Sequence, residues 1–354
     1  MDSRAALGNT ANLDAKGGVP HLHSDGDVAL AGPVLPRIGD QFGDDEFGVD
    51  GFEVGRRNLA QVPTCGSRRC GVHRQLPGES DRHRAPSTTH HNKGVGRVVA
   101  VANQKGGVAK TTTAITVSAA LVEAGKRVLL VDLDAQACAT FSLGLDPEDL
   151  PDDTTDFLLG DAGDDQRQRD LRASLRITED GVWLLPATLS LAQADVALAN
   201  RPSRERLLAQ ALAPVRDEFD FVLIDCSPSL GLTTINALIA ADDVIVPVKC
   251  ETLSHRGLGQ LMETIDEVQR WSNPRLRMAG IVPTLFDGRT AHAKAVLADL
   301  GPRFGVPVFE PIPRSIRFAE APAVGRTILA TAPSSPGARA YRALAEELAQ
   351  ALAA

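Results

Sequence analysis

The sequence predicts an α/β fold in which a doubly wound, mostly parallel sheet is flanked by helices. Two observations support this class. From residue 97 onward, apolar runs of strand length alternate with longer stretches of helical periodicity. The runs are also rich in β-branched residues and nearly continuous, which is typical of strands covered on both faces. Ligands of such sheets bind at the carboxyl ends of the strands.

The expected elements follow one another along the chain. The strand-length apolar runs are Val98–Ala102, Val128–Val131, Phe221–Ile224, Val244–Val248 and Met278–Val282. Helical periodicity is found between and after these runs, in Thr113–Glu123, Gly257–Trp271, Ala291–Phe304 and Ala338–Ala353. Pro333–Gly337 is expected to form a turn before the last helix, because proline, serine and glycine interrupt regular structure.

Residues 1–95 differ from the rest in being dense in Gly, Asp, Arg, Pro and His without sustained periodicity. We expect them to form a disordered extension, and residues 96–354 to form the folded domain. Four residues of the extension could suggest zinc: Cys65, Cys70, His73 and His83. Their Cys-x4-Cys spacing lies outside the tight zinc knuckle, so a solvated tail is the favoured interpretation.

Composition narrows the function classes. The formal net charge of -8 means that any contact with nucleic acid requires a local basic patch. Five cysteines, an odd number, indicate reduced thiols in a cytoplasmic protein, and Cys226 and Cys250 are expected to be buried and inert. No apolar run approaches the ~20 residues of a membrane span. The acidic stretch Asp146–Asp170 is expected to be a solvated excursion between core elements.

The stretch Asn103–Thr113, NQKGGVAKTTT, follows the first predicted strand and opens the first predicted helix. Gly106 and Gly107 allow a tight turn that presents backbone N–H groups to an anion at the helix N-terminus. Lys110 then stands where the lysine of a phosphate-binding loop reaches the phosphates, and Thr111 can offer its hydroxyl to Mg²⁺. The usual pattern G-x-x-x-x-G-K-[ST] nevertheless fails at both glycines.

These residues resemble the deviant loop K-G-G-x-x-K-[ST] of the ParA/MinD family of P-loop ATPases. The loop reads here Lys105, Gly106, Gly107, Val108, Ala109, Lys110, Thr111. Similarity continues in VLLVDLDAQACAT, FVLIDCSPSLGLTTINAL, VIVPVKCE and PIPRSIRFAEAPAVGRTI. The resemblance covers roughly three quarters of the chain, and the Soj-like ParA branch, which partitions chromosomes and plasmids, fits best. It implies a P-loop NTPase fold, ATP and Mg²⁺ as ligands, and hydrolysis of ATP to ADP and phosphate.

The resemblance also implies how the two lysines divide their work. Lys110 serves the nucleotide of its own subunit, in a binding loop that runs from Lys105 to Thr112. Lys105 matches the signature lysine, which crosses a nucleotide-dependent homodimer to reach the partner subunit's ATP. A cation delivered in this way would make hydrolysis depend on dimerisation, since phosphoryl transfer requires charge neutralisation.

The carboxylates have implied roles as well. Asp134, the second aspartate of the D-x-D-x-Q pattern, would help to orient the attacking water, with Gln136 in the same switch segment. The alternative is that Asp132 and Asp134 merely cap the next helix. Asp225 corresponds to the Walker B carboxylate and would hold the Mg²⁺ shell together with Thr111.

The chain departs from the family pattern at two positions. Ala109 replaces the usual glycine and sets a methyl group against the loop, and Ser227 stands where proline is common. In addition, the family's own start would fall near residues 95–98, and no Met lies between Met1 and Met262. A valine-encoding start codon there is therefore an alternative, in which residues 1–95 are not translated.

Other branches of the superfamily fit less well. MinD-type proteins end in a basic amphipathic helix that binds lipid, whereas the last helix here carries Glu346 and Glu347, so core packing is expected. The tyrosine kinases of the superfamily end in a tyrosine cluster, but Tyr341 is the single tyrosine. The iron-sulfur reductases of the superfamily need two well-placed cysteines in each subunit, and no convincing second cysteine accompanies Cys138. The N-terminal extension lacks two clear helices of a helix-turn-helix.

ParA-like proteins bind non-specifically to double-stranded DNA as ATP dimers. The resemblance assigns this role to Arg289 and Arg317, and Arg314 and Lys294 are nearby candidates. It implies a ParB-like centromere-binding partner that stimulates hydrolysis, a cytoplasmic, nucleoid-associated location and no membrane binding. Two alternatives remain open at this stage. One is a MinD-like ATPase that positions a membrane or protein complex, and the other is a nucleotide-binding module that no longer hydrolyses ATP.

Overall fold

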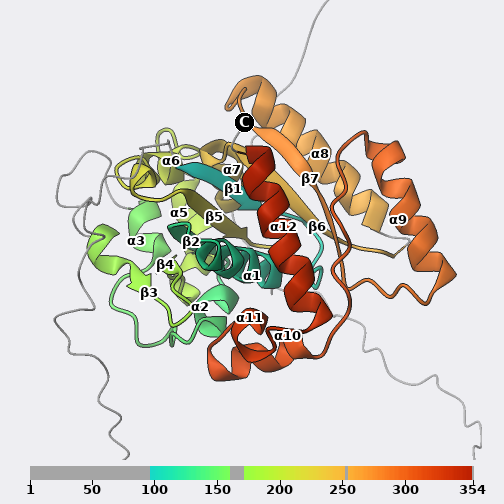
Figure 1. The fold of residues 1–354 in the computed structure, drawn as a ribbon. Coiled ribbons are helices and arrows are strands. Elements are labelled where there is room, and N and C mark those ends of the chain that lie inside the picture. The colour runs from blue at the N-terminus through green and yellow to red at the C-terminus, as the bar shows by residue number, and fades with distance from the viewer. Residues whose placement is uncertain (1–95, 160–170, 252–253, 353–354) are drawn as a thin grey trace, which may run out of the picture. The chain divides into compact units, whose positions relative to one another are not determined.

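The computed structural model describes residues 96–159, 171–251 and 254–352. The predicted extension, residues 1–95, and its cysteine and histidine residues lie outside this part of the chain, as do residues 160–170 of the acidic stretch. Within the described residues the strands form one sheet in the order β3-β4-β2-β5-β1-β6-β7 (Figure 1). Their bounds are β1 Arg97–Val101, β2 Val128–Leu133, β3 Arg176–Ile177, β4 Trp183–Leu185, β5 Phe221–Cys226, β6 Asp243–Lys249 and β7 Arg277–Thr284.

Every pairing in the sheet is parallel except that of β3 with β4, so the predicted doubly wound α/β class is confirmed. The central strands β2, β5 and β1 are buried almost throughout, in agreement with their continuous apolar sequences. Their register aligns Val101 with Asp225 and Asp132 with Asp225. The carboxyl ends of these three strands therefore meet at one edge of the sheet.

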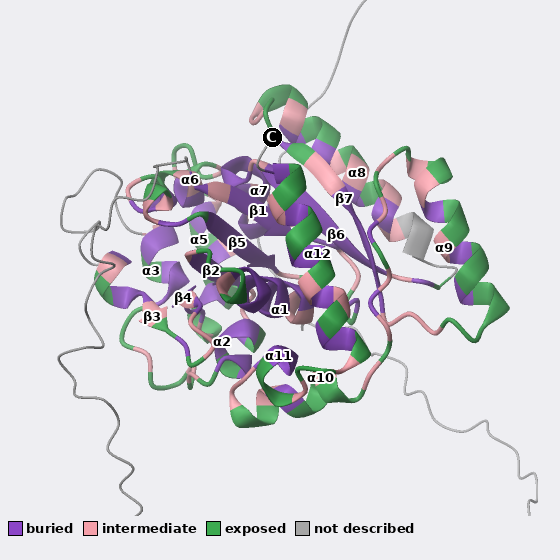
Figure 2. Ribbon diagram, viewed as in Figure 1, coloured by how far each residue is buried: buried purple, intermediate pink, exposed green. Residues whose placement is uncertain are grey.

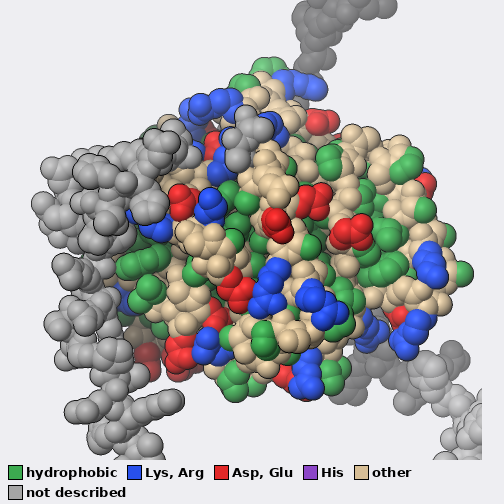
Figure 3. All heavy atoms as spheres, in the orientation of Figure 1, with side chains coloured by type: hydrophobic (Ala, Val, Ile, Leu, Met, Phe, Trp, Pro, Cys, Tyr) green, Lys and Arg blue, Asp and Glu red, His purple; other side chains and the backbone are tan. Residues whose placement is uncertain are grey.

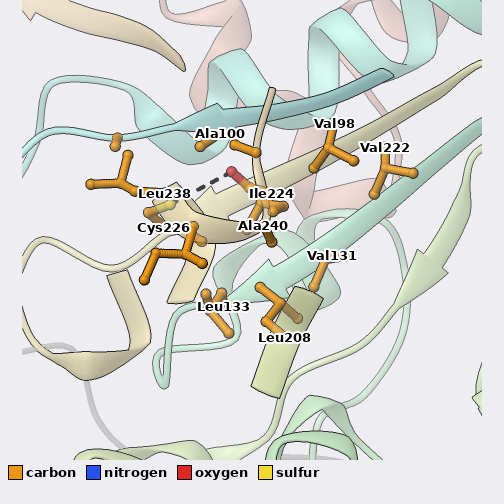
Figure 4. Close-up of a cluster of buried hydrophobic side chains, with 14 of the residues drawn as sticks. Val98, Ala100, Val131, Leu133, Leu208, Val222, Ile224, Cys226, Leu238 and Ala240 are labelled. Atoms are coloured by element: carbon orange, nitrogen blue, oxygen red, sulfur yellow. Dashed lines mark hydrogen bonds between the residues drawn. The ribbon is translucent and has the colours of Figure 1, made fainter. Parts of the chain in front are cut away.

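Helices cover both faces of the sheet. They are α1 Lys110–Glu123, α2 Cys138–Ser142, α3 Thr154–Leu159, α5 Ala194–Leu198, α6 Leu207–Leu212, α7 Leu232–Ala240, α8 Ser254–Trp271, α9 Ala291–Phe304, α10 Arg317–Glu320, α11 Ile328–Thr331 and α12 Pro336–Leu352. Figure 2 shows the central strands buried and the outer sides of the helices exposed. Apolar side chains of α6 and α7 pack with alternate strand residues on one face (Figure 4), and α1 and α12 pack on the other.

The last helix contributes to the core, as the sequence predicted. Tyr341 is fully buried, and its hydroxyl lies 2.9 Å from that of Thr113 on α1. The polar side of α12 presents Glu346 and Glu347, and acidic and basic side chains are interspersed over this face of the molecule (Figure 3). An anionic lipid surface would require a predominantly basic face instead. No helix of the described part of the chain is long and apolar enough to cross a membrane.

One expectation was wrong. The acidic stretch 146–170 is not simply solvated, because α3 lies within it and buries Phe157 and Leu158 in the main apolar cluster. The helix is held by Thr154, whose hydroxyl donates to the backbone oxygens of Asp132 and Pro186. The acidic residues around it masked this short apolar segment in the sequence.

Candidate active site

The connection between β1 and α1 lies at the edge of the sheet where β1, β2 and β5 end. Asn103 fixes its first half from a buried position. Its side-chain amide donates to the backbone oxygen of Pro247 on β6 at 2.7 Å, and its side-chain oxygen accepts from the backbone N–H of Lys105 at 2.9 Å. Sequence reasoning assigned no role to Asn103, although it directly precedes the loop.

The glycine pair gives the loop an open surface. A Cβ added to Gly106 or Gly107 would meet no atom within 4 Å, and Gly107 has φ +69°, a conformation that favours glycine. Ala109 also adopts the left-handed conformation, with φ 65° and ψ 35°. An L-residue pays about 1 kcal/mol or more there. The position thus keeps the backbone of a glycine although the residue is alanine.

Lys110 and Asp225 place opposite charges inside the protein beside this loop. The Lys110 side chain is buried and its ammonium donates to the backbone oxygen of Lys105 at 3.2 Å. Burial lowers the pKa of Lys110, while the Asp225 carboxylate acts in the opposite direction. Asp225 is fully buried, and neither of its carboxylate oxygens forms a hydrogen bond of normal geometry, although the Thr111 hydroxyl lies close enough to act against the rise of its pKa. Burial and the neighbouring Asp132 raise its pKa well above the ordinary range.

Asp132 and Asp134 differ sharply in environment. One Asp132 oxygen accepts from the backbone N–H and the hydroxyl of Thr140, at 2.9 and 2.7 Å, and the other accepts from the backbone N–H of Asp134 at 3.2 Å. Burial raises the pKa of Asp132 to about 6. Asp132 therefore anchors the segment 134–140, whereas Asp134 is half-exposed and accepts only a local bond from the backbone of Gln136 among the bonds found for its side chain.

The second lysine of the loop points elsewhere. The Lys105 ammonium is partly exposed and lies 3.4 Å from a carboxylate oxygen of Glu251, which also pairs with Lys249 at 2.6 Å. These two cations lower the pKa of Glu251, with Lys249 the larger cause. Lys105 and Lys110 thus occupy separate environments, one outside the protein and one within it.

The two arginines expected to bind DNA lie outside the phosphate-binding loop. Arg289 follows β7 and is 90% exposed, and its guanidinium makes two 2.9 Å bonds to Asp287. The pairing lowers the pKa of Asp287 to about 2. Arg317 begins α10, is 59% exposed and lies 2.9 Å from Glu320. A parallel bridge between Phe286 and Pro313 brings the two arginine-bearing segments side by side.

Comparison with known proteins identifies the architecture. A family profile described as an AAA domain matches residues 96–278. The chromosome-partitioning ATPase Soj of Thermus thermophilus is 48% identical over 254 residues, which cover 71% of this chain and 95% of that protein. The chromosome partitioning protein ParA of Myxococcus xanthus is 43% identical over 256 residues, 72% of this chain and 88% of that protein. This chain belongs to the ParA/MinD family of P-loop ATPases.

Solved structures agree with this assignment. The crystal structure of cobyrinic acid a,c-diamide synthase from Mycobacterium smegmatis, with bound ADP and magnesium, is 48% identical, covers 73% of this chain and 96% of its own, and gives a TM-score of 0.64. The septum site-determining protein MinD of Pyrococcus horikoshii, complexed with Mg-ADP, is 26% identical with a TM-score of 0.57, and the match covers 71% of this chain and 95% of that one.

The residues of this ParA-type ATPase fit its ligands, ATP and Mg²⁺. An orphaned, buried carboxylate at Asp225 needs a cation, and the half-buried Thr111 at the start of α1 carries a hydroxyl that could share it. The open glycine turn and the buried ammonium of Lys110 could hold phosphate oxygens. The enzyme hydrolyses ATP. The two thiols that were expected to be buried, those of Cys226 and Cys250, are buried, while Cys138 is exposed.

Replacing Asp225 by asparagine should stabilise the nucleotide-free protein while it removes Mg²⁺-dependent hydrolysis. A buried carboxylate without partners costs about 1–3 kcal/mol, so Tm should rise by roughly 3–8 °C. Because the folded-state pKa is raised, the carboxyl destabilises the fold progressively as pH rises above its unfolded value of ~3.9. The gain should therefore be larger at pH 8 than at pH 5.

Thermal melts at the two pH values, without nucleotide, measure this gain. Asp149→Asn is the matched control, since Asp149 is exposed and far from the loop in sequence. A variant that melts below the parent at pH 8 would contradict the unpaired state of Asp225.

Proposed function

We propose that this ATPase partitions DNA: an ATP-dependent homodimer binds double-stranded DNA without sequence preference, and hydrolysis stimulated by a ParB-like centromere-binding protein releases it. The observation that carries the proposal is the pair of exposed arginines, Arg289 and Arg317, on segments joined by a backbone bridge. The two guanidinium groups are themselves largely exposed, and ion pairs of exposed side chains contribute little, so DNA phosphates can compete with Asp287 and Glu320 for them. Relatives named as chromosome-partitioning proteins support the same function.

In this proposal the ATPase unit spans residues 96–354, and its loop from Lys105 to Thr112 binds the nucleotide. Lys110 contacts the phosphates from inside the protein, and the Thr111 hydroxyl and the Asp225 carboxylate hold the Mg²⁺ shell. When bound, Mg²⁺ neutralises charge on the phosphate oxygens. The buried setting of Lys110 strengthens its interaction with an anion, because little water competes for the ammonium.

Asp134 has the proposed role of orienting the attacking water. Its backbone is held by Asp132, so its position is defined, while its own carboxylate remains half-exposed beside the site. A carboxylate in this position can accept a hydrogen bond from water and so direct a lone pair at the γ-phosphate.

Lys105 has the proposed role of serving the partner subunit's ATP. Its partly exposed ammonium faces Glu251 rather than the interior where Lys110 lies, so one subunit does not use both lysines on the same phosphates. Hydrolysis would then require two subunits, and it would convert the DNA-bound dimer into free monomers. The protein would lie in the cytoplasm, associated with the nucleoid.

Gel shifts with an arbitrary duplex test the proposal directly. The ATP-loaded protein is expected to bind at least about tenfold more tightly than the ADP-loaded protein, because dimerisation doubles the phosphate contacts. Pelleting with anionic liposomes runs in parallel. Sedimentation with lipid and no ATP-dependent DNA shift would reject partitioning in favour of a MinD-like positioning function.

A further inference from the structure

Thr284, the last residue of β7, contacts the phosphate-binding loop although β6 separates β7 from β1 in the sheet. Its side chain is fully buried, and its hydroxyl donates to the backbone oxygen of Val108 at 2.9 Å. Val108 directly precedes Ala109. The contact therefore acts on the peptide group that leads into the strained residue.

The hydrogen bond determines the orientation of that peptide. Because the peptide is planar and trans, a carbonyl held toward Thr284 directs the N–H of Ala109 the opposite way. With the peptide in this orientation, Ala109 has a φ of +65° at the N-terminus of α1, one residue before Lys110. A flip of the peptide would change this angle. The left-handed conformation is unfavourable for alanine, so leaving it lowers the free energy of the loop. Without an external contact, a flip of the peptide therefore becomes easier.

A flipped peptide would harm nucleotide binding. It would replace a donor by a carbonyl oxygen on the side of the loop away from Thr284, and an oxygen repels phosphate. It would also shift the first turn of α1, which carries Lys110 and Thr111. Glycine at position 109 would adopt the left-handed conformation without strain and would depend less on the contact.

We propose that Thr284 is a positioning residue for nucleotide binding, which holds the Val108–Ala109 peptide in place and compensates for alanine in a position that favours glycine. Leu285, the residue directly after Thr284, also has a left-handed backbone, with φ 50°. Thr284 does not act on the reacting atoms. It acts through the loop that binds them.

A double-mutant cycle on the full chain tests this role. The variants are Thr284→Val, which keeps the shape and removes the hydroxyl, Ala109→Gly, and the two combined. Thr284→Ser keeps the donor and is the conservative control. Binding of Mg-ADP is measured by titration calorimetry, KM and kcat for ATP by steady-state turnover, and the folded fraction by urea denaturation.

Thr284→Val is expected to weaken Mg-ADP binding and raise KM about tenfold, the effect of one lost hydrogen bond, with kcat at saturating ATP nearly unchanged. In the Ala109→Gly background the same replacement should cost only about twofold, and Thr284→Ser should stay within about twofold of the parent. If Thr284→Val unfolds alone but folds with Ala109→Gly, the coupling is equally established.

Three outcomes would overturn the proposal. The first is parent-like Mg-ADP binding by folded Thr284→Val. The second is an equal loss in both backgrounds, which would show that the hydroxyl does not act on Ala109. The third is unfolding of Thr284→Val in both backgrounds, which would make the contact structural only.

Discussion

Lys110→Ala is expected to lose ATP binding by a factor of about 100 or more, while Lys105→Ala keeps most of its binding and loses hydrolysis. The reason lies in their environments. Lys110 is buried, where an ammonium–phosphate contact is strong, and its removal also leaves the Asp225 carboxylate without a neighbouring cation. Lys105 is partly exposed and faces Glu251, so a nucleotide in the same subunit does not depend on it.

Fluorescent-nucleotide titration measures binding, and phosphate release measures turnover over a range of protein concentrations. Lys126→Ala is the matched control, since Lys126 is exposed beyond the C-terminal end of α1, and it should behave as the parent. Asp134→Ala should bind ATP, form the dimer and stall. Normal turnover by Lys105→Ala at limiting protein concentration would show that the cross-subunit role is wrong.

The position of the nucleotide site was predictable because its signal is local. A buried apolar strand, a glycine pair, a lysine and a helix occur within a short stretch, and strand ends of a parallel sheet meet at one edge whatever the intervening loops do. Asp132 and Asp225 could be placed there for the same reason, and their register confirms the placement.

The residues that shape the site were not predictable in this way. The hydrogen bond from Thr284 to Val108 joins positions 176 residues apart, and the bond from Asn103 to Pro247 joins positions 144 apart. Neither pairing leaves a periodic or compositional trace in one sequence. The short strands β3 and β4 and the helix α3 were missed because tertiary packing stabilises them more than their own propensity does.

At Ala109 the sequence showed the substitution but not its effect on the backbone. The substitution of the usual glycine was visible in the sequence, but its consequence was not, because alanine could have changed the loop or been forced into it. The φ of +65° shows that the fold imposes the glycine conformation. Local preference was overridden by contacts that the sequence alone does not reveal.

Charge reversal at Arg289 or Arg317 is expected to weaken ATP-dependent DNA binding while basal ATP hydrolysis stays intact, since their ion pairs are with Asp287 and Glu320 and not with residues of the nucleotide loop. In a dimer each replacement removes two phosphate contacts. The salt slope should therefore fall by about 1.8, and affinity at ~0.1 M salt should fall on the order of 50-fold. The loss should be similar for all duplex sequences, because phosphate contacts carry no base information.

Gel shifts of Arg289→Glu and Arg317→Glu at several salt concentrations give both affinity and slope. Arg303→Glu is a close control, because Arg303 pairs with Asp299 on α9 much as Arg317 pairs with Glu320, at 2.8 and 2.9 Å, and is similarly exposed. Equal losses in Arg303→Glu would indicate a general effect of net charge rather than a site. If Arg317→Glu binds DNA as well as the parent, Arg317 is not part of the interface. If the salt slope is flattened in both variants and unchanged in the control, DNA binds at the two segments that the Phe286–Pro313 bridge joins.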